Sequence, residues 1–176
     1  MGVKNFFLHF LILFSIFTIC ISADETECIY GVYVQTGSIR RAGTHSVISL
    51  TLTDTSGEQL EIPNLEDWGL MGPGYNYFET GNLDLFGGKG PCFTGPICGL
   101  NLTSDGSGPY HGWYCDYVEV TAIGLQKECS QQHFTVEQWL ATDSPPYQLT
   151  AERNVCLRNG KNRKINGPNL SVVSSN

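Results

Sequence analysis

Basic residues are scarce in this chain of 176 amino acids, which has ten Lys and Arg against seventeen Asp and Glu. The shortage is sharpest between Asp24 and Cys156, where all seventeen acidic residues stand with only five basic ones, a formal net charge of −12. Nucleic-acid-binding proteins need a basic surface for phosphates, so this balance excludes a nucleic-acid partner. It equally disfavours adhesion to anionic membranes through overall charge. Any membrane contact must then be apolar, bridged by calcium, or made through the basic residues after Cys156.

The motifs of common hydrolases are missing as well. No Gly-x-Ser-x-Gly nucleophile elbow occurs, and the Asp-Thr-Ser-Gly stretch at Asp54 has no second copy to complete a carboxylate dyad. The stretch 111–115 places a thiol, Cys115, four residues after a histidine, His111. On an extended strand this separation is roughly 13 Å, too far for a direct hydrogen bond. We therefore expect no catalytic residues and predict that the protein is not an enzyme, with Cys115 buried or bridged.

The first residues have the layout of a secretory signal peptide. A single cation, Lys4, precedes an apolar run over residues 6–21, and the small residues Ser22 and Ala23 follow. This pattern predicts a signal peptide over residues 1–23. An uncleaved anchor helix is the alternative, but the run is near the short limit for spanning a bilayer. We expect the protein in the secretory pathway, either in the ER lumen or outside the cell.

The rest of the chain divides into one domain and a tail. Residues 24–156 are enough to bury a hydrophobic core of ordinary size. Residues 157–176 contain four basic residues, no acidic residue and little apolar periodicity, so we predict a disordered tail.

Six cysteines follow the signal peptide, and none has the spacing of a zinc site. The nearest two, Cys92 and Cys98, are separated by five residues, whereas zinc knuckles have gaps of two to four. An even number of cysteines on the secretory route favours disulfides instead. The candidates are Cys28, Cys92, Cys98, Cys115, Cys129 and Cys156.

Helical periodicity is absent, and apolar residues alternate with polar ones. In the stretch 47–54, Ile48, Leu50 and Leu52 would face one side of a half-buried antiparallel strand. Many short strands with Gly- and Pro-rich turns are typical of a β-sandwich. We predict strands at 28–37, 47–54, 97–102, 113–124 and 134–141, with shorter candidates at 58–65 and 81–87.

One predicted strand has an irregular apolar pattern. Trp113 and Cys115 are followed by Val118 and Val120, so the alternation slips by one residue between the two pairs. A β-bulge would keep both pairs facing the core. The alternative is a central strand covered on both faces, where alternation carries no information.

A long segment from Asn64 to Gly81 is rich in both glycine and apolar residues. Its glycines and proline exclude a regular element, yet its large side chains are costly to leave in water. It either plugs one open end of the sandwich or docks onto a membrane interface or a partner protein. The candidate contact residues are Trp68, Leu70, Met71 and Tyr75.

Three stretches of the chain resemble a known family. The stretch WYCDYVEV, residues 113–120, resembles the Trp-x-Leu-x-x-Val-x-Val strand of PLAT domains, with Cys115 in place of leucine. The stretch FTVEQWLA, residues 134–141, is similar to the Phe-x-x-x-x-Trp-Leu strand that closes that domain. Residues 33–52 are similar to its opening, a strand followed by Thr-Gly, a loop, Gly-Thr and a second strand. Together with the signal peptide and short tail, the chain resembles the single-domain PLAT stress proteins of plants.

This resemblance implies an eight-stranded antiparallel β-sandwich of the PLAT type, built from two four-stranded sheets. It implies no catalysis, but binding to a lipid or membrane interface, a protein partner, or both. For a plant single-domain member it suggests a role in abiotic stress tolerance, and we expect a monomer. The alternative is a purely protein-interaction or chaperone-like module that binds no lipid.

The resemblance also bears on metals. Relatives often have Asp or Asn after Gly-Thr, where it helps to hold calcium, but this chain has His45. Calcium prefers oxygen ligands and imidazole is a poor substitute, so we disfavour calcium at residues 43–45 and expect no metal or other cofactor. The other oxygen-bearing candidates are expected to be solvated turn carboxylates; they are Asp54, Glu58, Asp84 and Asp105.

In a PLAT-like sandwich the first and last strands are expected side by side. This arrangement implies the disulfide Cys28–Cys156, with Cys92–Cys98 and Cys115–Cys129 completing the set. Two glycosylation sequons are also present, at Asn101 and Asn169.

Overall fold

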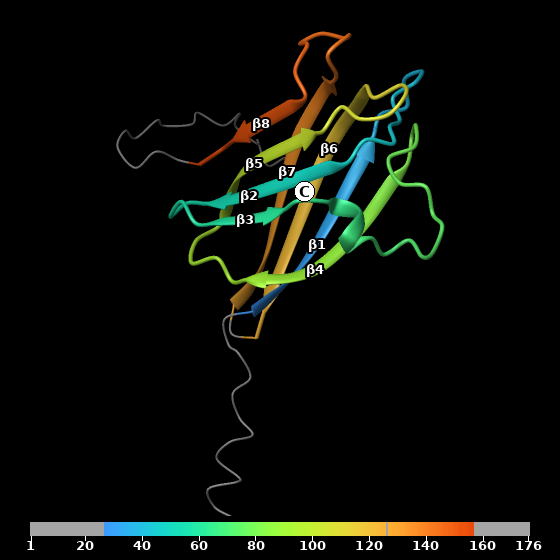
Figure 1. Ribbon diagram of the computed structural model, residues 1–176. Coiled ribbons are helices and arrows are strands. Elements are labelled where there is room, and N and C mark those ends of the chain that lie inside the picture. Colours follow the sequence, from blue (N-terminus) through green and yellow to red (C-terminus); the bar gives the residue numbers. More distant parts are fainter. Residues whose placement is uncertain (1–26, 126, 157–176) are drawn as a thin grey trace, which may run out of the picture.

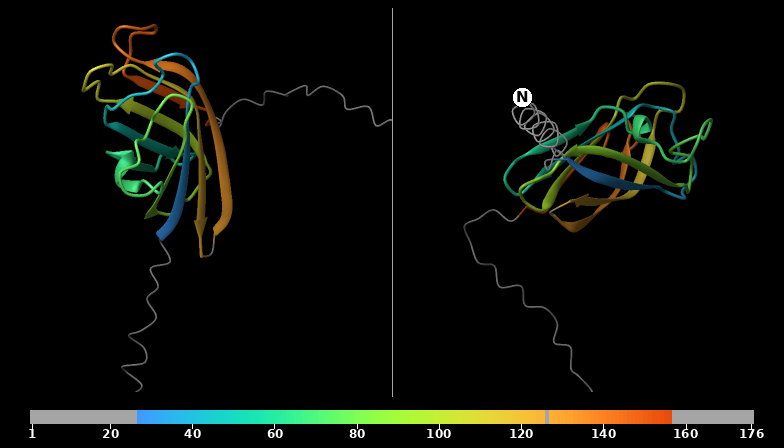
Figure 2. Two further views of the ribbon diagram at one scale, coloured as in Figure 1. Left: turned by 90° about the vertical axis from the view of Figure 1, so that its right-hand side faces the viewer. Right: turned by 90° about the horizontal axis from the view of Figure 1, so that it is seen from below.

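Two antiparallel β-sheets lie face to face and enclose a hydrophobic core (Figure 1, Figure 2). The computed structural model describes residues 27–125 and 127–156, so the predicted signal peptide and tail lie outside the described residues. Within these residues the first sheet has the strand order β4-β1-β6-β7 and the second β3-β2-β5-β8. The predicted eight-stranded sandwich is confirmed. The elements are β1 Glu27–Thr36, β2 Ile48–Asp54, β3 Gln59–Ile62, the 3₁₀ helix η1 Leu65–Trp68, β4 Leu83–Pro91, β5 Ile97–Ser104, β6 Trp113–Gly124, β7 Lys127–Leu140 and β8 Thr150–Asn154.

The core is filled by every second residue of the strands. In β2 the buried apolar residues are Ile48, Leu50 and Leu52, and the Ser and Thr residues between them are partly exposed. β1 follows the same rule, with Tyr30, Val32 and Val34 facing inward. The alternation places one face of each sheet in the core, as predicted. No helix within the described residues is long and apolar enough to cross a membrane.

The irregularity in β6 is a β-bulge, one of the two alternatives considered from the sequence. Cys115 pairs with Thr36 of β1, but Tyr117 pairs with the adjacent residue Gln35, so β6 has one extra residue, Asp116, between them. The shift brings Trp113, Cys115, Val118 and Val120 all into the core, each with no exposed surface.

The two strands that differ most from prediction are both at sheet edges. β7 begins at Lys127, seven residues before the predicted start at Phe134, and β8 was not predicted. Residues 127–133 and 150–154 are mostly polar, because an edge strand needs few apolar residues once its neighbour pairs with it. That neighbour is β6 for β7 and β5 for β8.

The predicted disulfide pairing is wrong. The structure has Cys28–Cys92 and Cys98–Cys156, and not the expected Cys28–Cys156, Cys92–Cys98 and Cys115–Cys129. The first and last strands are not neighbours, because β1 lies in one sheet and β8 in the other. Each disulfide instead joins chain segments that are already adjacent in one sheet. Cys28 of β1 is bonded to the residue after β4, and Cys98 of β5 to a residue just after β8.

Candidate functional site: the loop between β3 and β4

The connection from Pro63 to Asn82, here called the long loop, is tightly anchored to the sandwich. Phe78 has no exposed surface; its ring stacks on Phe86 with centroids 5.5 Å apart and meets the edge of Trp113 at 5.3 Å. Tyr77 is also buried, and its hydroxyl accepts a hydrogen bond from the backbone of Met71. This part of the loop therefore plugs the sandwich, one of the two roles considered from the sequence.

A buried carboxylate holds the same loop from inside. Asp84 has no exposed surface, and its two oxygens accept hydrogen bonds from the Tyr75 hydroxyl at 2.9 Å and the Phe78 N–H at 2.7 Å. Asn82 donates to the Tyr75 hydroxyl in turn. Burial raises the pKa of Asp84, although these two hydrogen bonds oppose the shift. Tyr75 is thus an anchor for the loop.

The four predicted contact residues separate into two anchors and two exposed residues. Trp68 is partly buried and lies flat against β4, where a Cβ atom at Gly88 would be 2.3 Å from Trp68 Cδ2. Tyr75 is the second anchor. Leu70 and Met71 instead remain 58% and 40% exposed. The glycine at position 88 allows the indole to approach the strand, because it has no side chain in the way.

Leu70 continues an apolar strip along the outer face of β4. Its N–H donates to the Leu85 carbonyl, and its side chain fills the space above Gly87. Leu83 and Leu85 point to the same outer side as Gly87, because Asp84 and Phe86 between them point inward. Leu83 is 47% exposed. We define the apolar strip as Leu70, Met71, Leu83 and Leu85; the two β4 residues were not predicted from the sequence.

The carboxylates considered as calcium ligands are used in other ways. Asp54 and Asp84 are buried and hydrogen-bonded, so the expectation of solvated turn carboxylates is wrong for these two residues. Glu58 and Asp105 are exposed, as expected. The Asp105 Oδ1 accepts the N–H groups of Val47 and Ser107, which stabilises the turn after β5.

The segment 43–45 does not have the ligands of a calcium site. The His45 ring lies 3.6 Å from one oxygen of Glu79, and Asn76 donates to that same oxygen. In the described part of the chain, no three His, Cys, Asp or Glu side chains gather closely enough to hold a metal ion. One carboxylate beside an imidazole does not fit calcium, which prefers six to eight oxygen ligands.

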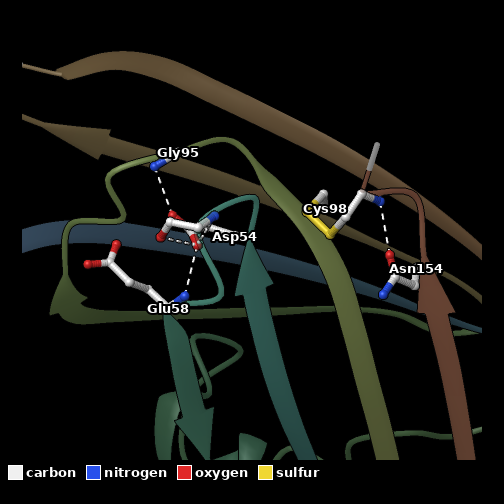
Figure 3. Close-up of a disulfide and its surroundings, with 7 residues drawn as sticks. Asp54, Glu58, Gly95, Cys98 and Asn154 are labelled. Atoms are coloured by element: carbon white, nitrogen blue, oxygen red, sulfur yellow. Dashed lines mark hydrogen bonds between the residues drawn. A yellow bond between two sulfur atoms is a disulfide. The ribbon is translucent and has the colours of Figure 1, made fainter. Parts of the chain in front are cut away.

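Asp54, the last residue of β2, joins the β2–β3 loop to the β4–β5 loop (Figure 3). Its Oδ1 accepts from the Ser56 and Glu58 N–H groups, and its Oδ2 from the Gly95 N–H at 2.8 Å. Burial raises the pKa of Asp54, but the hydrogen bonds from Ser56, Gly95 and Glu58 together outweigh it and hold the pKa below its ordinary value. The disulfide between Cys98 and Cys156 lies near this site, and the Cys156 N–H donates a hydrogen bond to the Asn154 side chain (Figure 3).

We expect Asp54→Asn to lower the free energy of unfolding at neutral pH by about 1.5–3 kcal/mol, the usual size of hydrogen bonds to a charged group. The pKa of Asp54 is lower in the folded protein than its ordinary value of 3.8, so the ionised carboxylate stabilises the fold at pH values above 3.8. This stabilisation is lost as the pH falls through the folded-state pKa. Urea unfolding at pH 7 and pH 3 measures the difference. The exposed Asp143, changed to Asn, is the matched control. Equal losses for both variants, or a difference for Asp54→Asn that does not shrink in acid, would contradict the prediction.

The histidine and cysteine of the stretch 111–115 do not form a catalytic pair. The His111 ring nitrogen contacts the Thr142 hydroxyl at 3.0 Å, and the Cys115 sulfur points to the Tyr117 carbonyl. Cys115 has no exposed surface, and burial raises the pKa of its thiol. It is unpaired, as is the exposed Cys129. Of the two sequons, Asn101 is exposed on β5 and accepts a hydrogen bond from Thr103, whereas Asn169 lies outside the described residues.

Comparison with known proteins identifies the sandwich. The family model for the PLAT/LH2 domain matches residues 30–152. The chain is 52% identical over 158 residues to PLAT domain-containing protein 1 of Arabidopsis thaliana, covering 89% of this chain and 87% of that protein. It is 54% identical over 147 residues to PLAT domain-containing protein 2 of the same plant, covering 83% and 80%.

Solved structures agree on the fold. The chain is similar to coral 8R-lipoxygenase, described as activated by calcium through a C2-like domain, with a TM-score of 0.52 and 23% identity. The similarity covers 72% of this chain but only 16% of the lipoxygenase. An alpha toxin from Clostridium absonum gives a TM-score of 0.50 at 17% identity, covering 78% of this chain and 34% of the toxin. The matched residues, the two-sheet order and the Arabidopsis relatives lead to one conclusion: the chain belongs to the PLAT/LH2 domain family.

Proposed function

We propose that this protein is a non-catalytic docking module of the plant secretory pathway, which binds a lipid interface or a protein partner and contributes to abiotic stress tolerance. The observation that carries the proposal is the apolar strip. The side chains of Leu70, Leu83 and Leu85 lie on one outer side of an otherwise acidic domain, and the exposed Met71 follows Leu70 in the chain. Exposed apolar surface of this kind is typical of docking sites.

The rigidity of the strip supports docking. Leu70 is fixed by its backbone hydrogen bond to Leu85 and by the anchors Trp68 and Tyr75 on either side of it in the chain. A preformed surface loses little conformational entropy on binding, so its apolar area contributes more of its transfer free energy to affinity.

The secretory route is supported by two independent features. The predicted signal peptide directs the chain to a compartment in which disulfides form. Two disulfides join the described strands, at Cys28–Cys92 and Cys98–Cys156. The exposed side chain of Asn101 is available for a glycan there. The stress role is supported by the resemblance to plant single-domain members of the family.

The surroundings of Cys115 and His111, the candidate catalytic pair, support a non-catalytic function. Cys115 is buried with a raised pKa, and His111 contacts a threonine. A thiol nucleophile requires a thiolate beside a base, which this arrangement does not supply.

A protein partner is the second candidate. The strip runs along β4, an edge strand of the first sheet, and a flat apolar edge also suits a protein surface. Pull-down from the secretory pathway with the unmodified protein, compared with a variant lacking the strip, tests this alternative.

Sedimentation with phosphatidylcholine vesicles tests the lipid interpretation. We expect Leu70→Ser/Met71→Ser to weaken binding by roughly tenfold or more, because each side chain would lose about 1 kcal/mol of apolar transfer free energy. The matched control is Ile123→Ser, which removes a similarly exposed aliphatic side chain from β6. No vesicle binding by the unmodified protein would leave the protein-partner function alone. An equal loss of vesicle binding by Ile123→Ser would show that the apolar strip is not the contact surface.

A further inference from the structure

The outer face of the second sheet is made of small and polar residues. In β3, β2, β5 and β8, which form this sheet, every large apolar side chain points into the core. A face without apolar side chains gains little free energy by leaving water, so it is unsuited to apolar docking. Its outward residues are Gln59 and Glu61 on β3, Ser49, Thr51 and Thr53 on β2, Gly99, Asn101 and Thr103 on β5, and Thr150, Glu152 and Asn154 on β8.

The outer face of the first sheet has the opposite chemistry. Ile29 of β1 and Ile123 of β6 are direct cross-strand partners and are 62% and 55% exposed. Leu83 and Leu85 of the apolar strip point to the same outer face from β4. Of the two described sheets, the first alone therefore presents apolar surface to a lipid or a protein partner.

Asn101 lies at the centre of the polar face. Its strand, β5, is an inner strand between β2 and β8 (Figure 1), and Asn101 is opposite Thr51 on one side and Glu152 on the other. The side chain of Asn101 is exposed, whereas Leu102 after it is fully buried. Asn101, Leu102 and Thr103 form the sequon Asn-x-Thr, and the first and third residues of a strand segment point to the same side. The strand therefore presents both polar residues of the sequon to solvent.

The Asn101 amide is free at the atom that N-glycosylation uses. Its Oδ1 accepts the Thr103 hydroxyl at 3.2 Å, and in the described part of the chain its Nδ2 group donates no hydrogen bond. N-glycosylation is a substitution at the anomeric carbon of an oligosaccharide that is activated by a diphosphate. Nδ2 forms the new C–N bond and loses one proton, while the bond from that carbon to the diphosphate oxygen breaks and the diphosphate leaves with the electron pair. Oδ1 remains available to Thr103, so a glycan at this position breaks no hydrogen bond of the fold.

We propose that Asn101 carries an N-linked glycan, which covers the polar outer face of the second sheet and leaves the outer face of the first sheet open for docking. A glycan is bulky and strongly hydrated, so a membrane or a protein surface cannot approach the face that bears it. The core of the sandwich separates the first sheet's outer face from the glycan. This inference rests on the secretory route of the proposed function, and it adds a modification site and the orientation in which the domain docks.

Expression of the full chain in plant cells, followed by mass spectrometry of its peptides, tests the modification site. We expect the peptide that contains Asn101 to carry an N-glycan, and peptide N-glycosidase A to remove it and leave aspartate at that position. Asn101→Gln should lose this glycan completely. Thr103→Ala keeps the asparagine but should also lose the glycan, whereas Thr103→Ser keeps the hydroxyl and should retain it. Asn169→Gln is the matched control and should leave the glycan on Asn101 unchanged.

Vesicle sedimentation tests the orientation. Protein with its Asn101 glycan and protein from which the glycan has been removed are compared on phosphatidylcholine vesicles, and we expect equal binding because the glycan lies on the side away from the apolar strip. The variant Gln131→Asn/His133→Thr creates a new sequon at two exposed positions on the outer face of β7 in the first sheet. A glycan there should lower the fraction of protein that sediments with the vesicles.

The outcomes separate this inference from the proposed function. A chain that does not enter the secretory pathway defeats the proposed route, and the glycan with it. A chain in the secretory fraction with both disulfides formed but with an unmodified Asn101 overturns the glycan alone. Stronger vesicle binding after removal of the Asn101 glycan would show that the polar face takes part in docking, and this overturns the orientation. If neither form binds vesicles, the lipid function fails, and the same two forms are compared by pull-down of the protein partner.

Discussion

Replacing Cys98 and Cys156 together by serine is expected to lower the free energy of unfolding by about 4 kcal/mol. The disulfide closes a loop with a sequence separation of 58 residues, and a cross-link of that length removes much of the conformational entropy of the unfolded chain. The native contacts around it are already made by the backbone, since the Val155 N–H donates to the Cys98 carbonyl at 2.8 Å. The loss should therefore come mainly from the unfolded state.

Denaturant unfolding of the double variant, without reductant, measures this loss. Cys129→Ser is the matched control, because Cys129 is exposed and unpaired and its removal opens no loop. We expect the control to change stability by less than about 0.5 kcal/mol, as is usual for surface substitutions. Similar stability for the double variant and the control would mean that this disulfide does not constrain the unfolded chain.

Trp113→Ala is expected to cost about 3–5 kcal/mol, the range for deleting a large buried aromatic side chain. Trp113 has no exposed surface, and its indole N–H donates to the equally buried hydroxyl of Thr36 at 3.0 Å. Its ring also supports Phe78, the buried residue that anchors the long loop. The change therefore creates a cavity, leaves a hydroxyl without its donor and loosens the loop that carries Leu70.

The control for this variant is Trp139→Ala. Trp139 is partly exposed on β7 and packs against Tyr114, so we expect less than half the loss. Urea unfolding gives the stabilities, and protease cleavage within residues 69–76 reports on the loop. Equal losses for the two tryptophans, or an intact loop in a destabilised Trp113→Ala variant, would contradict the role assigned to Trp113.

The sandwich itself was predictable because its strands obey simple rules. Alternation in β2 and the slip in β6 both follow from the need to keep apolar side chains on one face. The structure has the predicted strand, and at the slip it has the bulge that was one of the two alternatives. The polar edge strands were harder, since β8 is defined by its pairing with β5 and not by its own composition.

The site was less predictable for a related reason. Apolar residues at 83 and 85 alternate with Asp84 and Phe86, and the usual rule would place the aspartate outside. The structure places Asp84 inside, because the Tyr75 hydroxyl and the Phe78 N–H compensate its burial, and both come from a loop with no regular pattern. The prediction of the disulfide pairing failed for a similar reason, since spacing along the chain does not reveal which sheet a strand joins.

The positions of the two disulfides also matter for mechanical strength. Cys28 is the second residue of the first strand, β1, and Cys156 lies two residues after the last strand, β8, so the cross-links stand at the two ends of the sandwich in the chain. Without Cys156, a pull on the C-terminal end would peel off β8, a strand of only five residues at a sheet edge. With the Cys98–Cys156 disulfide, the pulling force passes directly to β5, an inner strand of the sheet. The hydrogen bonds between β8 and β5 then do not bear that force. Local unfolding and proteolysis that begin at either end of the chain should stop at Cys28 and Cys156. A force applied to either end would then leave the domain folded.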